Sequence, residues 1–178
     1  MKRTRRTSIS IFTLAILFFF KAAPSFGDLV VEFADPAWDG KMIPLGQHCK
    51  KFGGNGATPP LTVSNIPAEA NAIIVEFNDR DYQPLSKNGG HGKIGFDIDT
   101  GINSVTLPAV PGGTNEMPEG VWLVKKNRAT GAWRSKGYLP PCSGGRKNQY
   151  EAIVHAVEKT SKKEFNKISK AKIVLGKY

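Results

Sequence analysis

Turn-forming residues punctuate almost the whole chain, and they leave room only for short elements of regular structure. The clusters are Asp39-Gly40, Gly53-Gly54-Asn55-Gly56, Pro59-Pro60, Asn88-Gly89-Gly90, Pro111-Gly112-Gly113, Pro140-Pro141 and Gly144-Gly145. Such clusters mark turns, because glycine allows positive φ angles and proline cannot continue a helix or a paired strand. Many short strands joined by such turns are typical of a β-sandwich or a β-barrel. We therefore expect a mainly β protein.

Short apolar stretches between these turns supply the candidate strands. Residues 72–77 are apolar almost throughout, which predicts a strand buried in a sheet. The full set of expected strands is 29–33, 72–77, 93–98, 121–124, 150–157 and 172–175. Residues 161–170 favour a helix, because Ser161 and Glu164 have the spacing of a capping box. Without an internal repeat or a linker, we expect one domain over residues 28–178.

The first 27 residues have the pattern of a secretory signal peptide. Four basic residues and no acidic one precede an apolar run over residues 9–20, and Ser25 and Gly27 stand at the −3 and −1 positions of a peptidase site. The run is shorter than the roughly 20 residues of a membrane-spanning helix. We therefore expect cleavage after Gly27 and a periplasmic or secreted protein without a transmembrane segment. A permanent N-terminal anchor is the alternative.

Removal of this leader changes the charge of the chain. The leader holds five of the 25 basic residues and none of the 15 acidic ones, so the net charge falls from +10 to 20 − 15 = +5. Much of the remaining excess lies between residues 159 and 177. A modest positive charge serves solubility or attraction to anionic surfaces, and it does not require a nucleic-acid partner. We expect none.

Two cysteines remain in the mature chain, Cys49 and Cys142. An exported chain with an even number of cysteines is permitted a disulfide, but the count alone leaves the pairing open. A metal site is not expected, because neither cysteine has the CxxC or histidine spacing that zinc sites use.

Three polar groups follow the candidate strands and could bind a ligand. Asp79 and Asp81 come directly after strand 72–77 and point to the same side of an extended chain. His91 lies in a glycine-rich turn, where the backbone can approach a ligand closely. Residues 138–150 combine Pro-Pro with Gly-Gly, a loop that can offer N–H groups to an anion. The simpler interpretations are a charged strand end, a solvated histidine and an ordinary loop.

The sequence carries no motif of the common enzyme classes. A nucleophile elbow, a P-loop, an HExxH motif and a dinucleotide fingerprint are all absent, so no cofactor is expected. Ser143 and His91 lack the spacing of a nucleophile and its base. Asp79 and Asp81 are too close in sequence for the opposed carboxylates of a glycosidase. The residues alone indicate an exported β-protein with a small anion pocket.

The order of these groups resembles the phosphatidylethanolamine-binding protein (PEBP) family, which includes the Raf kinase inhibitor proteins. Its members carry an S-P-x-L segment, then D-P-D-A-P, H-W, a proline-rich loop and H-R-Y. The matching segments are Thr58-Pro59-Pro60-Leu61, Asp79-Arg80-Asp81, His91-Gly92, residues 138–144 and Asn148-Gln149-Tyr150. Exported bacterial members look most similar, since they also carry one cysteine before a glycine-rich turn and one in the proline-rich loop. The resemblance covers nearly all of residues 30–178.

This resemblance implies an antiparallel β-sandwich with short C-terminal helical elements and a Cys49–Cys142 disulfide. It also implies a non-enzymatic protein whose small pocket takes a phosphate-like anion or a phospholipid head group. Carried over to this sequence, the ligand-binding residues are Asp79, Asp81, His91, Pro141, Gly144, Asn148 and Tyr150. His91 and Tyr150 would donate hydrogen bonds to a phosphate oxygen, and Asp79 would orient His91 or accept an ammonium group.

Several residues depart from the family pattern. Asn148 stands in place of a histidine, Gly92 in place of the tryptophan of H-W, and Arg80 in place of a proline. Arg80, Arg146 or Lys147 could restore the lost positive charge. The alternative is a protein-interaction or inhibitor module with a protein partner. Such a module would act through its surface and its basic tail, and its pocket would no longer bind the family ligand.

Overall fold

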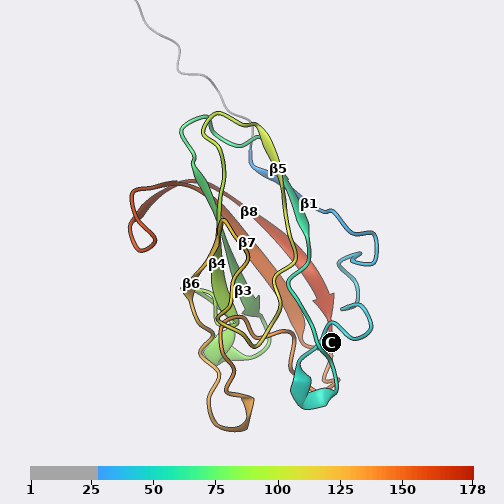
Figure 1. Ribbon diagram of the computed structural model, residues 1–178. Helices are drawn as coiled ribbons and strands as arrows, with labels where there is room; N and C mark the ends of the chain where they lie inside the picture. The colour runs from blue at the N-terminus through green and yellow to red at the C-terminus, as the bar shows by residue number, and fades with distance from the viewer. Residues whose placement is uncertain (1–27) are drawn as a thin grey trace, which may run out of the picture.

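Two antiparallel β-sheets pack against each other in the computed structural model, which describes residues 28–178 (Figure 1). The smaller sheet has the strand order β1-β2-β5, and the larger one has the order β6-β4-β3-β7-β8. The strands are β1 (Val30–Phe33), β2 (Leu61–Ser64), β3 (Ala72–Asp79), β4 (Gly92–Asp97), β5 (Ser104–Leu107), β6 (Val121–Lys125), β7 (Gln149–Lys159) and β8 (Phe165–Lys177). This is the expected mainly β, antiparallel sandwich.

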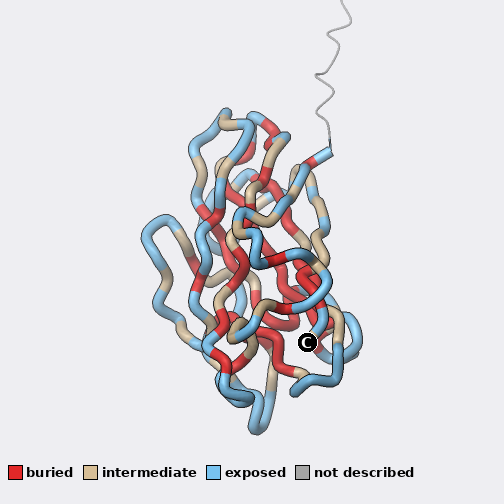
Figure 2. Tube along the Cα trace, turned by 90° about the vertical axis from the view of Figure 1, so that its right-hand side faces the viewer, coloured by how far each residue is buried: buried red, intermediate tan, exposed pale blue. Residues whose placement is uncertain are grey.

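The main core lies between the two sheets. Val63 of the small sheet packs in one cluster with Val75 and Val154 of the large sheet, and all three are buried. Strand β3 is buried along all of its eight residues, because a second cluster around Trp122 covers the outer face of the large sheet. The buried segments therefore run along the middle of the molecule, and most of the exposed chain lies at its periphery (Figure 2). Burial of this apolar surface is the main stabilising term of the fold.

Loops from distant parts of the sequence gather at the end of the molecule where the C-terminus lies (Figure 1). They carry the 3-10 helices η1 (Lys50–Phe52), η2 (Gln83–Leu85) and η3 (Gly131–Trp133). A disulfide joins Cys49, directly before η1, to Cys142 in the proline-rich loop, and their Cα atoms are 5.2 Å apart. The implied pairing of the two cysteines is confirmed.

Most of the expected strands are confirmed within a few residues. The six predicted segments lie in β1, β3, β4, β6, β7 and β8, and the sequence analysis missed β2 and β5 as strands. Both missed strands have only four residues.

The predicted helix over residues 161–170 is wrong. Ser161 does use its hydroxyl to accept hydrogen bonds from the N–H groups of Lys163 and Glu164, but this closes the turn between β7 and β8. Strand β8 then begins at Phe165 and pairs with β7 from end to end. Such a ladder of interstrand hydrogen bonds outweighs a weak local helix preference. Helical structure within residues 28–178 is limited to η1, η2 and η3, so the implied helical elements are only minor and the described chain ends in β7 and β8.

Strand β8 forms one edge of the large sheet. Exposed lysines recur along it at Lys167, Lys170 and Lys172. Within the described part of the chain, the only strand that pairs with β8 is β7, apart from a single bridge between Met42 and Lys177.

The predicted signal peptide lies outside the described residues. Within residues 28–178, no helix is long and apolar enough to span a membrane.

Candidate functional site

The ends of β3 and β7 bring the first group of predicted site residues together. Asp79 is the last residue of β3, and its register partner on β7 is Tyr150. The N–H of Arg80 donates to the carbonyl of Gln149, so the pairing of the two strands continues just past the end of β3. Asn148 precedes β7 and therefore lies beside Asp79.

Asp79 is a buried carboxylate whose hydrogen-bonding capacity is largely used within the protein. The side-chain amide of Asn148 donates to both of its oxygens, at 3.1 and 2.8 Å. The backbone N–H groups of Asp81 and Tyr82 donate to its Oδ1 at 3.0 and 3.1 Å. Asn148 therefore keeps a direct contact with Asp79 although it cannot carry a charge.

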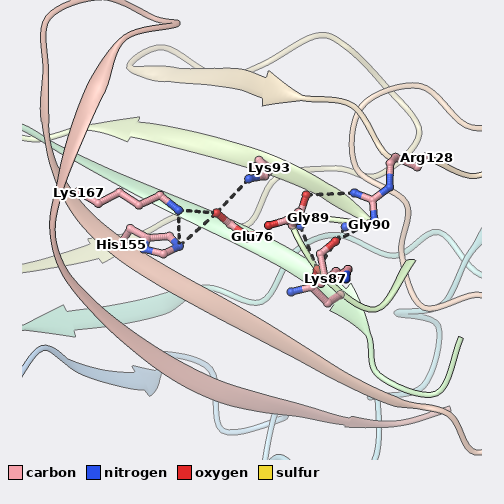
Figure 3. A network of polar contacts seen from close by, with 10 residues as sticks. Glu76, Lys87, Gly89, Gly90, Lys93, Arg128, His155 and Lys167 are labelled. Atoms are coloured by element: carbon pink, nitrogen blue, oxygen red, sulfur yellow. Dashed lines mark hydrogen bonds and ion pairs between the residues drawn. The ribbon is translucent and has the colours of Figure 1, made fainter. Parts of the chain in front are cut away.

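A tight turn before β4 positions His91. The side chain of Asn78 accepts hydrogen bonds from the N–H groups of Gly89 and Gly90, and Arg128 donates to the carbonyls of Pro84, Lys87 and Asn88. Figure 3 shows Arg128 reaching over this turn. A Cβ atom at Gly90 would lie only 2.1 Å from the carbonyl oxygen of Leu85, so the turn requires glycine there.

His91 is buried, and one of its ring nitrogens has no partner. Its Nδ1 lies 2.7 Å from the carbonyl oxygen of Leu139, which can only accept a hydrogen bond, so Nδ1 carries a proton. Its Nε2 is buried without a hydrogen-bond partner. Burial lowers the pKa of His91, although the Leu139 carbonyl and the charge of Asp79 act in the opposite direction. The neutral ring therefore presents an acceptor at Nε2, and only a protonated ring presents a donor there.

This geometry differs from one role that the resemblance implied. The carbonyl of Leu139 orients His91, and Asp79 instead binds Asn148. No sequence motif indicates Leu139, because the group that acts is a backbone carbonyl.

Tyr150 packs against His91 and binds the proline-rich loop. Its ring meets the ring of His91 edge-on with 5.3 Å between centroids, and its hydroxyl accepts a hydrogen bond of 3.1 Å from the N–H of Cys142. Burial raises the pKa of Tyr150, and the charge of Asp79 raises it further. The phenol therefore stays protonated and fixes the proline-rich loop against β7.

A cavity of about 320 Å³ opens in front of these residues. Asp79, His91 and Asn148 form part of its polar wall together with Ser143 and Arg146. Its apolar lining comes from Leu85, Ala129, Trp133, Leu139 and Cys142. Its volume lies at the small end of the range of about 300–1,000 Å³ that is typical of ligand sites.

The other predicted residues lie around the cavity and do not line it. Asp81 is exposed and accepts a hydrogen bond of 2.7 Å from the N–H of Gln149. Pro141 accepts one from the N–H of Cys49, and Gly144 packs against the ring of Phe52. Together with Tyr150, these residues shape the loops that enclose the cavity.

Of the three cations considered as a replacement for the lost histidine charge, Arg146 is the one that lines the cavity. Arg80 instead forms an ion pair of 3.5 Å with Glu151.

The glycine that replaces the family tryptophan also has a structural explanation. Gly92 has a φ angle of 121°, which side chains of L-residues rarely adopt, and a Cβ atom there would lie 3.2 Å from the Cα of Tyr138. The local backbone is therefore adapted to glycine.

A second polar cluster, which the sequence analysis did not identify, lies on the outer face of the large sheet (Figure 3). Glu76 of β3 is buried and accepts hydrogen bonds from Lys93 at 3.0 Å and Lys167 at 2.9 Å. Nε2 of His155 lies 3.2 Å from the same carboxylate oxygen. Four strands each contribute one of these side chains, so the Glu76 cluster ties β4, β3, β7 and β8 together.

Comparison with known proteins identifies structures that share this fold. No protein-family model matches the chain. A curated protein of Chlamydia trachomatis, described as a UPF0098 protein, is 26% identical over 119 residues, which are 67% of this chain and 70% of the relative.

Two solved structures share the fold. A PEBP homologue from Chlamydia trachomatis has a TM-score of 0.52 and 19% identity, over 85% of this chain and 97% of its own. YbcL of Escherichia coli, described as a member of the mammalian PEBP family, has a TM-score of 0.54 and 20% identity, over 85% and 98% of the two chains. The resemblance found in the sequence is thus confirmed at the level of the fold.

Proposed function

We propose that this chain with the PEBP fold is an exported, non-enzymatic binding protein whose cavity at His91 holds a small phosphate-like anion. The anion would be free or the head group of a phospholipid. The observation that carries the proposal is that His91 lines the cavity while its buried Nε2 has no hydrogen-bond partner. A buried polar atom without a hydrogen bond is costly, and a ligand in the cavity would satisfy it.

The hydrogen bonds around His91 define how an anion would bind. Since Nδ1 donates to Leu139, a bond from Nε2 to a phosphate oxygen needs one more proton. This proton comes either with a monoprotonated phosphate or by protonation of the ring. Arg146 at the cavity wall supplies further positive charge. Anion binding through the protonated ring is therefore coupled to the uptake of one proton, whereas a monoprotonated phosphate brings its own proton.

The hydrogen bond of Ser143 supports the non-enzymatic part of this proposal. Ser143 lines the same cavity as His91, but its hydroxyl donates to the carbonyl of Tyr178. A serine nucleophile would instead donate to a base such as His91.

Titration with inorganic phosphate and with phosphorylethanolamine tests the proposed ligand. The chain has three histidines, so NMR of their ring resonances can resolve the site. We expect the signals of His91 to shift at millimolar ligand, whereas those of His48 and His155, which do not line the cavity, stay in place. Where the ring of His91 takes up the proton, the affinity should fall as pH rises, by up to about tenfold per pH unit for this single linked proton.

The ligand-free protein should show the opposite linkage. The pKa of His91 is lower in the folded state than its ordinary value of 6.5, so the unfolded state binds more protons below that pH. The free energy of unfolding should therefore decrease as pH falls below about 6.5, and phosphate should offset the loss. A His91→Gln variant should lack both effects. Equal phosphate binding by this variant and the wild type would refute the proposed site.

The assignment as an exported protein rests on the leader pattern over residues 1–27 and on the Cys49–Cys142 disulfide, which is compatible with an oxidising compartment. Under this proposal the mature protein is a single domain over residues 28–178. The intact mass of the protein recovered from a secreting host should correspond to a chain that begins at Asp28 and has lost two hydrogens. A mass that includes residues 1–27 would contradict cleavage.

A further inference from the structure

A second and larger cavity lies on the other side of the proline-rich loop. It is a groove of about 640 Å³ between η1 and the segment that follows η3. The groove and the His91 cavity share the side chains of Trp133, Leu139 and Cys142 as a common wall. We call it the basic groove, because four of the residues that line it are cationic: Lys50, Lys51, Arg134 and Lys136.

Within the part of the chain that the structure describes, these four cations have no carboxylate partner. Among residues 28–178, every ion pair involves other residues, and the lining of the groove contains no aspartate or glutamate. The ammonium group of Lys51 instead lies 4.5 Å from the ring centre of Trp133 and 6.0 Å from that of Phe52. The groove therefore concentrates positive charge that no ion pair among residues 28–178 neutralises.

The walls of the groove are held in place by the fold. Lys50 and Lys51 follow directly after the disulfide-bonded Cys49, whose N–H also donates to the carbonyl of Pro141 at 3.0 Å. Gly56 and Gly112 line the groove where a Cβ atom would come within 2.9 Å of Pro140. Only glycine fits at these two positions, so the chain packs closely against the proline-rich loop there and the wall of the groove is tightly built.

The groove also presents aromatic surface. Trp133 is 45% exposed. An exposed aromatic ring offers an apolar face to a sugar ring, and amide or hydroxyl groups such as those of Asn55 and Ser135 can bond sugar hydroxyls. Cations beside such a ring suit carboxylate or sulfate groups on the same sugar.

We propose that the basic groove is a binding site for an acidic saccharide, with its sugar rings against Trp133 and its anionic groups on the four cations. An acidic polypeptide would use the same charges but has no need of the aromatic face. The site is separate from the His91 cavity, and it stands whether or not that cavity binds phosphate.

Calorimetric titration of the mature protein with a heparin-derived hexasaccharide tests this site. The double variant Lys50→Glu/Lys51→Glu should bind about tenfold more weakly or worse, because two attractive charges become repulsive. The affinity of the wild type should also decrease with added salt, since salt screens exposed charges. All four cations are exposed, so these changes should leave the fold intact, which a circular dichroism melt checks.

The matched control is Lys162→Glu/Lys163→Glu, which makes the same change of charge in the exposed turn between β7 and β8. It should bind the hexasaccharide within about twofold of the wild type, whereas an equal loss in both variants would show attraction to overall charge and refute the site. Trp133→Ala should weaken binding of the hexasaccharide but not of poly-glutamate. Tighter binding of poly-glutamate than of the hexasaccharide would overturn the saccharide assignment. His91→Gln should leave hexasaccharide binding unchanged, which separates this outcome from the phosphate test.

Discussion

Replacing Cys49 and Cys142 together by alanine is expected to lower the free energy of unfolding by about 4–5 kcal/mol. The disulfide closes a loop between residues 93 positions apart, and in the chain-entropy model a loop of that length contributes roughly this amount by restricting the unfolded state. The loss is a large fraction of the about 5–15 kcal/mol that stabilises a typical domain. Urea unfolding of the wild type and the double variant measures the difference.

The binding sites should be affected as well, because Cys142 lines both the His91 cavity and the basic groove. A reductant provides the control. It should destabilise the wild type to about the level of the double variant and leave the double variant unchanged. If the reduced and oxidised wild type unfold at the same urea concentration, the disulfide does not stabilise the fold.

Replacing Glu76 by glutamine should be the next most damaging change, with an expected loss of about 3 kcal/mol. The substitution removes the charge that Lys93, Lys167 and His155 surround, and breaking a buried ion pair leaves its partners uncompensated. Lys167 is half-exposed and can turn toward water, so we place the loss at the lower end of the range for such pairs. A matched control is Glu158→Gln, an exposed glutamate of β7, which should change the stability by less than about 0.5 kcal/mol.

The Glu76 cluster also has a pH signature. Burial opposes the ionisation of Glu76, but the hydrogen bonds from His155, Lys167 and Lys93 outweigh it and hold the pKa of this carboxyl well below 4.5. The unfolded state then binds more protons than the folded state as pH falls below about 4.5, so the contribution of Glu76 is complete above that pH and declines below it. The difference in stability between the wild type and Glu76→Gln should shrink as the solution is acidified from pH 5 to pH 3. A difference that stays constant would contradict this assignment.

The sequence predicts the fold class well, because turn chemistry and apolar stretches are local signals. Strand 72–77 was recognised since its apolar residues are contiguous. The two short strands β2 and β5 lack such a run, and their pairing is long-range, which no local pattern encodes. The helix predicted over residues 161–170 rests on a real interaction, because the Ser161 hydroxyl does accept a hydrogen bond from the N–H of Glu164. The same interaction can begin a helix or close a hairpin, and here the pairing of β8 with β7 makes it a hairpin.

The candidate site was predictable only where side chains carry the chemistry. Asp79, His91 and Asn148 do meet in one cavity. The Leu139 carbonyl that orients His91 was not predictable, because a backbone group leaves no sequence motif. Arg128, which holds the turn before His91, was not predictable either, because it lies far from that turn in the sequence. The sequence analysis did not find the basic groove for the same reason. The pair Lys50 and Lys51 lies more than 80 residues from the pair Arg134 and Lys136, and only the fold brings the two pairs together.

The lysines of β8 have a consequence for the protein at high concentration. An edge strand with free N–H and C=O groups is a template on which the sheet of another molecule can grow, and this is a common beginning of fibrils. Lys167, Lys170 and Lys172 place like charges along that border, so two copies that approach edge to edge repel each other. Attempts to stabilise the strand with valine or threonine at Lys170 or Lys172 would raise its β-propensity and at the same time remove its protection against aggregation.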